Sequence, residues 1–563
     1  MRDSYSLKEY VQMILDKKFI PLTSHQRLWN ALVKNDSLLK DPVLSNADFF
    51  KKTIDEYFRP AGKGYDVRKR MLVLVGPPGS GKSTFVQKLK ESIIVYSYTD
   101  EGAVFRIKGC ALNEDPLLAV PEAIRSKIRQ CGIEVRGQLS TYNQYRLQQF
   151  QGEWENVQIE RFYLSEAKRQ GIGHFFPGDH YSQDQSDLLG SIDYSTITKY
   201  GSPSHPMAYR YDGEIQAANR GILELNEVFK CQRQLLYPFI SLSEEGSYKI
   251  SRQSPLCADE VVIGHTNETD LEDFIKEKNN EALTSRMVFI RVPYNLVLSN
   301  EIILYQEKLL NHDVSRLQYQ ALETLAMAVL LTRVKRSNQF PVTKMEKVML
   351  YNGEKVEGFS RDDLTEEYQD EGMSGIEPRM VFNLLAKVCA RDTDQIDAEL
   401  LLEELEISLK NDYVLPLQER EKFLNAIEQA RAYYHTKLYD LVLDFIEDEK
   451  MSDLDQNVQR YFQELSSETS FSKSVDSLME MNLKHNRDSL REWLEDDLDN
   501  IRYSDLPDDY QRIFKRFTLK QIQVTEENFR EQLYEYGLQQ WKNKSIFVSD
   551  SMLDTIDQLM RSE

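Results

Sequence analysis

The chain has 563 residues, of which 41% are hydrophobic, 10% aromatic and 29% charged, a composition typical of a globular protein with several domains. Its formal net charge of −21 would repel a phosphate backbone, so we do not expect nucleic acid as the main partner. No apolar run reaches the roughly 18 residues of a membrane span, and the N-terminus lacks the apolar core of a signal peptide, so we expect a cytoplasmic protein without a membrane partner.

The cysteines and histidines give no sign of a metal centre. The five cysteines are scattered without a CxxC pair, so we expect free thiols rather than disulfides or a zinc site. His174 and His180 are close in sequence, but no third residue accompanies them at the spacing of a metal site.

The first half of the chain predicts an α/β core. Residues 1–64 show helical patterning and end in the linker-like run Pro60-Ala61-Gly62-Lys63-Gly64. Residues 65–296 alternate strand-like apolar runs with helical stretches, which predicts a parallel sheet with helices on both faces. The expected strands are residues 71–75, 104–107, 221–228, 261–264 and 288–290.

The second half of the chain predicts helices. Strand signals fade after residue 297, and we expect residues 297–395 to form a helical lid. Residues 396–563 hold one glycine, Gly537, and two prolines, Pro416 and Pro507, so this part favours an α-helical C-terminal domain.

The strongest motif is a Walker A loop, Gly76-Pro77-Pro78-Gly79-Ser80-Gly81-Lys82-Ser83-Thr84. It follows the apolar run 71–75 and opens a predicted helix, which is the context that a phosphate-binding loop requires. Its backbone N–H groups would surround the phosphates, Lys82 would meet the β- and γ-phosphates, and the Ser83 hydroxyl would ligate Mg²⁺. The motif therefore predicts ATP and Mg²⁺ as cofactors.

Residues 217–228 have the pattern of a Walker B strand, an apolar run that ends in polar residues. Glu227 is placed to polarise the attacking water, although it could also be an ordinary surface residue. Asn226 stands where most such ATPases have an aspartate, and its amide could accept a hydrogen bond from a metal-bound water without supplying charge. Glu224, two residues earlier on the same face, is a candidate to compensate, and we expect slow turnover.

Three later residues occupy the positions of sensors and fingers in AAA+ ATPases. Asn267 ends the apolar run 261–264 and fits the residue that orients the attacking water. Arg286 precedes the run 287–292, where AAA+ proteins place the finger for a neighbouring subunit's γ-phosphate, and Arg379 suits a second sensor. Each arginine alone is more often a surface ion-pair residue, but the order of the motifs favours an AAA+ core.

The interval between Lys82 and Glu227 is long for such a core. Residues 187–190 and 212–215 resemble the segments that flank the helix-2 insertion of sigma-54-activator, MoxR and MCM-like AAA+ proteins. In those proteins the insertion forms a hairpin that pushes on a substrate in the centre of the ring.

A set of nine short motifs in order makes the chain similar to the PrkA family of bacterial serine protein kinases. They are residues 113–117, 171–173, 176–179, 182–184, 219–221, 265–268, 279–282, 292–294 and 370–376. The resemblance covers residues 68–390 and implies a P-loop NTPase core of the AAA+ type, a helical lid and a mainly α-helical C-terminal domain. It further implies serine protein kinase activity on protein substrates and a homo-oligomeric ring, for instance a hexamer.

The C-terminal region lacks the parts of a protein kinase of the usual type. With one glycine it has no glycine-rich loop, and Lys484-His485-Asn486-Arg487-Asp488-Ser489-Leu490 matches an HRD loop only with an inserted residue. An exposed helical turn explains that segment better, so the P-loop is the expected ATP site. Two other functions stay open: an ATP-driven protein remodeller or ATP-dependent protease component, and a nucleotide-switched scaffold with nearly silent hydrolysis.

Overall fold

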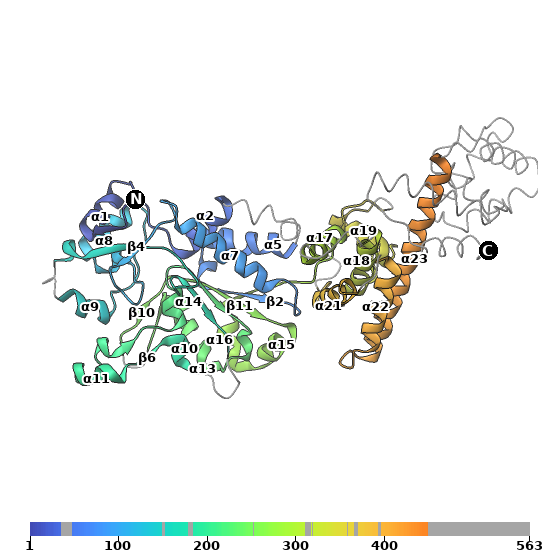
Figure 1. Cartoon of the computed structure of the whole chain (residues 1–563). Coiled ribbons are helices and arrows are strands. Elements are labelled where there is room, and N and C mark those ends of the chain that lie inside the picture. The colour runs from blue at the N-terminus through green and yellow to red at the C-terminus, as the bar shows by residue number, and fades with distance from the viewer. Residues whose placement is uncertain are drawn as a thin grey trace, which may run out of the picture. The chain divides into compact units, whose positions relative to one another are not determined.

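The computed structural model describes residues 1–34, 48–148, 153–177, 184–250, 253–309, 317, 319–356, 359–364, 370–391 and 396–448. The chain divides into two compact units (Figure 1). The first comprises Met1–Asn295 with Gly372–Glu377, and the second comprises Leu296–Glu371 with Pro378–Glu563. Residues 451–563, including the segment 484–490, lie outside the described residues.

A five-stranded parallel sheet forms the centre of the first unit, as predicted. Its strand order is β12-β2-β11-β8-β5, with β12 at Met287–Arg291, β2 at Met71–Val75, β11 at Val261–Thr266, β8 at Ile222–Leu225 and β5 at Ile172–Phe175. All residues of β2, β8 and β11 are buried, as expected for parallel strands covered on both faces. The sequence had not predicted β5, and β8 ends earlier than the predicted 221–228.

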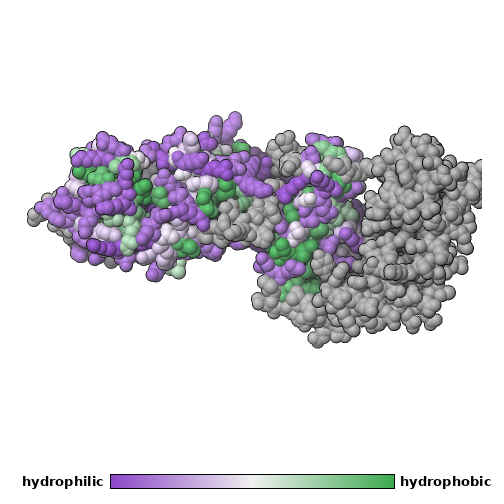
Figure 2. All heavy atoms as spheres, turned by 90° about the horizontal axis from the view of Figure 1, so that it is seen from above, coloured by the Kyte–Doolittle hydropathy of each residue, from purple (hydrophilic) through white to green (hydrophobic). Residues whose placement is uncertain are grey.

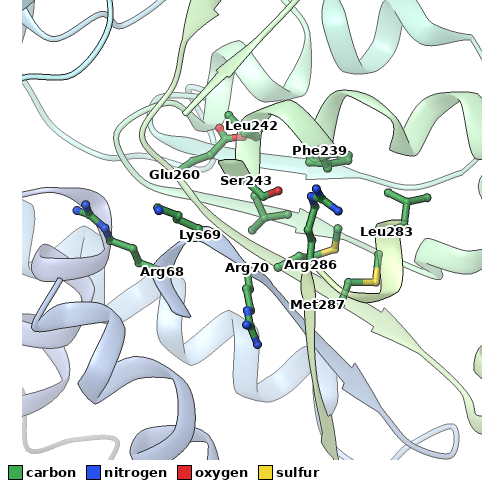
Figure 3. A pocket seen from close by; sticks show the side chains of 12 residues that line it. Arg68, Lys69, Arg70, Phe239, Leu242, Ser243, Glu260, Leu283, Arg286 and Met287 are labelled. Atoms are coloured by element: carbon green, nitrogen blue, oxygen red, sulfur yellow. The ribbon is translucent and has the colours of Figure 1, made fainter. Parts of the chain in front are cut away.

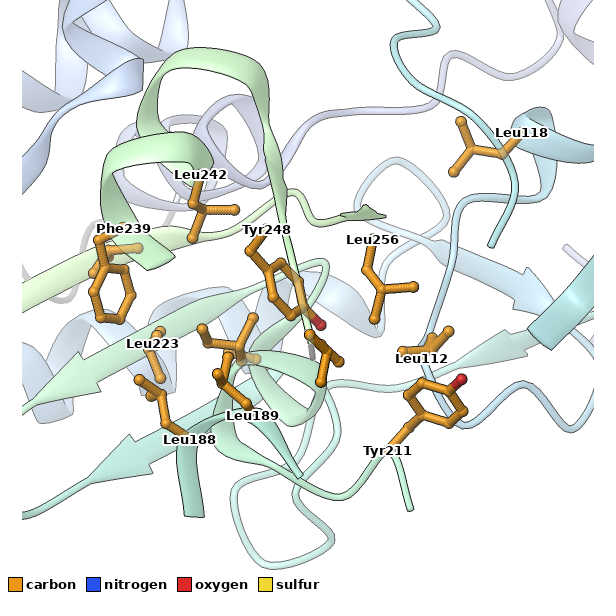
Figure 4. Close-up of a cluster of buried hydrophobic side chains, with 14 of the residues drawn as sticks. Leu112, Leu118, Leu188, Leu189, Tyr211, Leu223, Phe239, Leu242, Tyr248 and Leu256 are labelled. Carbon is orange, nitrogen blue, oxygen red and sulfur yellow. The ribbon is translucent and has the colours of Figure 1, made fainter. Parts of the chain in front are cut away.

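Helices cover both faces of this sheet. On one face, Leu74, Ile222 and Ile263 pack in a core with Phe85 and Leu89 of α7 (Lys82–Ser97). α2 (Ser24–Lys34) adds Leu28 and Leu32 to that core. On the other face, a second core joins α10 (Gln185–Leu189) and α14 (Pro238–Glu245) to the sheet; it includes Leu188, Leu189, Leu223, Phe239 and Leu242 (Figure 4). Successive strand side chains thus serve opposite cores.

A second, antiparallel sheet joins the N-terminus to this unit. Its order is β1-β4-β3, with β1 at Ser4–Ser6, β4 at Gln158–Phe162 and β3 at Val104–Ile107. The prediction of a strand at 104–107 is right, but its place in the parallel sheet is wrong, because β3 pairs antiparallel with β4. α1 (Leu7–Leu15) follows β1 directly, and Ser6 and Glu9 form a capping box at its start.

The remaining elements of the first unit are short. The helices are α5 (Asp48–Thr53), α6 (Arg59–Gly62), α8 (Glu122–Gln130), α9 (Thr141–Leu147), α11 (Tyr194–Tyr200), α12 (Glu214–Ala218), α13 (Arg233–Leu236), α15 (Glu268–Lys276) and α16 (Glu281–Thr284). The strand pairs are β6 (Ser191–Ile192) with β7 (Tyr209–Arg210), and β9 (Ser247–Tyr248) with β10 (Leu256–Cys257). The β6–α11–β7 excursion therefore begins and ends between the segments 187–190 and 212–215. The predicted linker at 60–64 lies partly in α6.

The second unit is helical where it is described, as predicted. Its helices are α17 (Leu298–Leu309), α18 (Tyr319–Arg333), α19 (Lys344–Tyr351), α20 (Arg361–Leu364), α21 (Pro378–Cys389), α22 (Ala398–Lys410) and α23 (Leu417–Asp448). Two ion pairs are buried inside it, Arg333 with Glu301 at 2.9 Å and Lys347 with Glu371 at 2.9 Å.

Hydrophilic side chains dominate the visible surface of the first unit (Figure 2). Hydrophobic side chains gather on this face in small separate patches. No helix among the described residues is both long and apolar enough to cross a bilayer.

Candidate functional site

The P-loop connects β2 to α7 at the carboxyl end of the central sheet. Gly76 follows β2, and its N–H donates to the Thr266 carbonyl oxygen at 3.1 Å. A Cβ added to Gly76 would lie 2.2 Å from the Val292 carbonyl oxygen, so only glycine fits between these strands. Gly81 has φ 93°, a left-handed conformation that glycine adopts without strain, directly before α7 begins.

Lys82 lies where the motif predicts it. Its Nζ donates to the carbonyl oxygens of Gly76 at 2.7 Å and Pro77 at 2.8 Å, so the ammonium group is held at the loop. Ser83 and Thr84 are exposed in the first turn of α7. Tyr294 fixes the loop from outside, because its hydroxyl donates to the Pro78 carbonyl oxygen at 3.0 Å.

Polar side chains replace apolar ones where the central strands approach their carboxyl ends. On the face covered by α7, the strands β5, β8 and β11 carry Ile172, Ile222 and Ile263. Two residues further along each strand, the same face carries His174, Glu224 and His265. His174 is directly opposite Glu224 in the pairing of β5 with β8. We call these three residues together with Asn226 the polar row.

Glu224 is the buried acid of the polar row. Its carboxylate pairs with Lys90 of α7 at 2.5 Å, and its other oxygen lies 3.3 Å from His265 Nε2. Lys90 also pairs with Glu166 at 2.6 Å. Burial, and then the charge of Lys82, lower the pKa of His265 to about 3, so this imidazole is neutral. Glu224 is therefore a structural anion shared by the P-loop helix and the sheet, as well as the candidate that the sequence offered to compensate for Asn226.

The side-chain amide of Asn226 has a polar contact at its nitrogen but, among the described residues, no hydrogen bond at its oxygen. Its Nδ2 lies 2.7 Å from His174 Nε2, and its Oδ1 is buried without a hydrogen-bond partner. Buried polar atoms without partners are rare and call for an explanation. His180, which the sequence pairs with His174, lies outside the described residues.

Glu227 occupies a sharp turn directly after the Walker B strand. Its φ of 46° and ψ of 47° are left-handed, a conformation that costs free energy for a residue other than glycine. Its half-exposed carboxylate pairs with Lys230 at 2.8 Å. To polarise a water molecule, the Glu227 carboxylate would therefore have to release Lys230 and bind the water instead.

Asn267 follows β11 as predicted, but its side chain caps a helix. Its Oδ1 accepts from the Asp270 N–H at 2.8 Å at the start of α15, and its Nδ2 donates to the Asp270 carboxylate at 2.8 Å. The sensor role of Asn267 remains a prediction.

Arg286 lies at the opposite edge of the sheet from the P-loop. Because β12 pairs parallel with β2, with Met287 opposite Met71 and Arg291 opposite Val75, Arg286 lies beside the start of β2. The five residues of β2 separate the two edges by about 17 Å at about 3.3 Å per residue. Arg286 therefore does not reach the P-loop of its own chain.

The surroundings of Arg286 are rich in cations. It lines a cavity of about 50 Å³ together with Arg68, Lys69, Ser243 and Glu260 (Figure 3). Its guanidinium pairs with Glu244, and its Nε is buried without a partner. Arg379 is exposed near the start of α21 in the second unit, and its role as a second sensor also remains a prediction.

Comparison with known families decides where the chain belongs. A model described as the PrkA AAA domain matches residues 3–340, and one described as the PrkA serine protein kinase C-terminal domain matches residues 345–543. The chain belongs to the PrkA family. The match extends beyond the residues 68–390 on which the sequence resemblance rests.

Two relatives within the PrkA family carry different names. The chain is 40% identical over 445 residues to "ATP-dependent protease PrkA" of Bacillus subtilis, covering 76% of this chain and 70% of the relative. It is 29% identical over 451 residues to "Serine/threonine kinase YeaG" of Escherichia coli K12, covering 76% of this chain and 66% of the relative. A solved structure of NtrX from Brucella abortus with ADP is 13% identical over 63% of this chain and 55% of that chain, with a TM-score of 0.26, too low to bear on the fold.

Sequence reasoning assigned no role in the site to several residues that the structure brings together there. His174, His265 and Lys90 surround the Walker B strand, Lys230 binds Glu227, and Tyr294 binds the P-loop. A signal for the two histidines was present, because each is a polar residue inside an otherwise apolar strand run. Lys90 had no such signal, since a lysine on a helix is usually exposed.

Proposed function

We propose that this PrkA-family chain binds and hydrolyses ATP·Mg²⁺ at its P-loop and acts on protein substrates, with serine protein kinase activity as the leading assignment. The observation that supports it most is the P-loop itself: a glycine-lined turn, a lysine held at its carbonyls, and a helix N-terminus after it. The AAA domain match covers this loop.

The residues at the P-loop fit Mg²⁺. Ser83 offers an exposed hydroxyl in the first turn of α7, and the unpartnered Oδ1 of Asn226 is an acceptor at the carboxyl end of β8. Mg²⁺ prefers oxygen ligands and keeps several of its waters, which an amide oxygen can orient. When bound, the ion would neutralise charge that develops on the phosphates.

The residues of the chain divide the remaining work. Lys82 would move from the carbonyl oxygens of the loop to the phosphates, and the backbone N–H groups would hold them. Glu227 would orient and polarise the nucleophile, which is water in hydrolysis or a serine hydroxyl in phosphoryl transfer. Asn267 would sense the γ-phosphate. Because Asn226 supplies no charge, we expect slow turnover.

The proposal includes a ring of identical chains. Arg286 lies at the edge of the sheet away from its own P-loop, so a contribution to phosphoryl transfer has to come from a neighbouring copy. A head-to-tail contact of this kind closes into a ring when the rotation between subunits permits, and a hexamer is our expectation. The division into residues 1–64, 65–296, 297–395 and 396–563 and the cytoplasmic location remain predictions of the sequence.

The kinase hypothesis competes with the hypothesis of a protease or remodeller. One relative is named as a protease and another as a serine/threonine kinase. Purified chain should be incubated with γ-³²P-labelled ATP and dephosphorylated casein, with Lys82→Ala as the control. Label on protein serine that is absent in the control supports the kinase. Free phosphate together with casein cleavage or unfolding supports the protease or remodeller, and ATP binding without either product supports the scaffold.

A further inference from the structure

The amide of Asn226 has two different ends, and only one of them is held. Its Nδ2 lies 2.7 Å from His174 Nε2 on the neighbouring strand, whereas its Oδ1 is buried without a partner. The backbone of Asn226 is fixed as well, because its N–H donates to the Phe175 carbonyl oxygen at 2.9 Å. With the backbone held, the orientation of the amide group decides which of its two atoms is left open.

The Asn226 amide contacts His174 through its NH₂ end. An NH₂ group is a donor, so in this orientation His174 Nε2 accepts with its lone pair and the ring proton is on Nδ1; a ring protonated at Nε2 would bind the amide oxygen instead. In this arrangement the amide oxygen is the free end. In the rotated arrangement the NH₂ group would be the free end, and it would present N–H donors to a metal-bound water that is itself a donor.

Other groups near His174 do not explain its position. The Glu224 carboxylate lies 4.0 Å from Nε2, which is too long for a hydrogen bond. Glu214 accepts from the backbone N–H of His174 at 2.9 Å, and this bond fixes the strand rather than the ring. The 2.7 Å contact with Asn226 is the short polar contact of the imidazole among the described residues.

We propose that His174 is a positioning residue that holds the Asn226 amide with its oxygen toward the water shell of the nucleotide-bound Mg²⁺. This inference rests on the proposed ATP·Mg²⁺ function and assigns it a residue that the Walker motifs do not contain. It also explains how an asparagine serves at a position where an aspartate is usual. A carboxylate has two equivalent oxygens and needs no such partner, whereas an amide has one oxygen and must be oriented.

The test measures metal binding rather than turnover. Mn²⁺ affinity should be determined by electron paramagnetic resonance with the full chain and saturating AMP-PNP. We compare wild type with His174→Ala, His174→Gln and His174→Asn. Glutamine can place its carbonyl oxygen near the position of Nε2, whereas asparagine is one bond shorter and cannot. The loss of one net hydrogen bond predicts about 2- to 10-fold weaker Mn²⁺ binding for the alanine and asparagine variants, and near wild-type binding for glutamine.

A second background separates positioning from support of the fold. In Asn226→Asp, replacing His174 by alanine should leave Mn²⁺ affinity within about 2-fold, because the carboxylate needs no orientation. Equal weakening in the asparagine and aspartate backgrounds, or no weakening in either, overturns the role of His174. Thermal unfolding without nucleotide identifies any variant that loses its fold. If His174→Ala is lost in this way, Mn²⁺ affinity is compared between His174→Gln and His174→Asn. If wild type binds AMP-PNP but Mn²⁺ does not add to the complex, the metal function fails together with this inference; if AMP-PNP itself does not bind, the ATP function fails.

Discussion

The carboxyl and amino ends of the central parallel strands form two edges of the sheet, and these edges differ in the buried polar atoms that lack hydrogen-bond partners. At the carboxyl edge, Asn226 Oδ1 is a buried acceptor without a hydrogen-bond partner among the described residues. At the amino edge, the atoms without partners include the Nε donors of Arg220 and Arg286 and both carboxyl oxygens of Glu260. The open acceptor at the carboxyl edge suits hydrated metal, and the open guanidinium donors at the amino edge suit phosphate.

A strained residue and a cleft accompany the open groups of the amino edge. Arg220 has φ 78° although it is not glycine, and it pairs with Asp115 at 2.8 Å. Arg220 and Glu260 line a cleft of about 190 Å³. Unsatisfied groups cost free energy in an isolated chain, so their concentration at one edge is what a surface completed by another molecule would show. Four predictions test this difference, from the largest expected effect to the smallest.

Arg286→Ala addresses the amino edge directly. The variant should keep ATP binding but lose hydrolysis by up to about 10³- to 10⁵-fold, the range of arginine fingers in phosphoryl transfer. Mixing it with Lys82→Ala should restore part of the activity in a concentration-dependent way, because some interfaces then pair an intact P-loop with an intact arginine. Phosphate release from the mixture is the measurement.

Glu244 offers the matched control for Arg286. Glu244→Gln removes the ion pair of Arg286 but leaves the guanidinium, so hydrolysis should persist. A mixture that stays inactive although native gels show co-assembly would leave Arg286 as an ordinary ion-pair residue.

Glu227→Gln addresses the carboxyl edge. The amide keeps the shape of the side chain but cannot act as a base, so hydrolysis should fall by about 10²- to 10⁴-fold while ATP stays bound. Lys230→Gln, which frees Glu227 from its ion pair, should not reproduce this loss. Single-turnover assays separate binding from hydrolysis, and an unchanged rate for Glu227→Gln would move the base assignment to Glu224 or elsewhere.

Lys82→Ala removes the cation of the P-loop. Loss of one partner from a buried charge pair costs about 2–5 kcal/mol, so ATP affinity should fall roughly 30- to 4,000-fold. Lys88→Ala, on the same helix, should bind ATP as wild type does. Titration with a fluorescent ATP analogue measures both, and near-normal affinity of Lys82→Ala would contradict the nucleotide site.

Glu260→Gln tests how the buried carboxyl group at the amino edge changes the free energy of unfolding with pH. Burial and then the charge of Asp259 raise the pKa of Glu260 well above its usual value, so the folded chain keeps a proton that the unfolded chain releases above about pH 4.5. Wild type should therefore lose stability relative to the variant as pH rises from about 4.5, by at most about 1.4 kcal/mol per pH unit until the folded pKa is reached. Thermal unfolding between pH 4 and pH 8 tests this, and a gap that does not change with pH would show that Glu260 is not protonated.

Much of the carboxyl edge could be predicted from sequence, because its parts are contiguous motifs. The P-loop, the strand before it and the positions of Glu227 and Asn267 follow from runs of adjacent residues. The contacts of Glu227 with Lys230 and of Asn267 with Asp270 could not be predicted, since they depend on side-chain geometry within single turns. β3 was assigned to the wrong sheet because an apolar run does not reveal its pairing partner, which here is β4.

At the amino edge, the sequence pointed to Arg286 but not to the groups around it. Its groups come from distant segments that the parallel sheet brings together, and no local spacing links Glu260 with Arg68 or Arg286. The same holds for the pairing of His174 with Asn226, which depends on β5 and β8 being neighbours. Where a site is assembled by topology rather than by a single loop, one sequence alone does not contain its geometry.

The short segment Gly372–Glu377 limits how the chain can be shortened. It belongs to the first unit although the residues on both sides of it belong to the second. Its Gly372 carbonyl oxygen accepts from the Tyr294 N–H at 2.8 Å, and its Ile376 is 1% exposed. A chain cut at residue 340, where the AAA domain match ends, would keep the whole P-loop but lose this segment. Such a fragment would leave the N–H of Tyr294, the tyrosine that anchors the P-loop, without the acceptor that Gly372 provides, so a fragment that keeps this support has to retain residues 372–377.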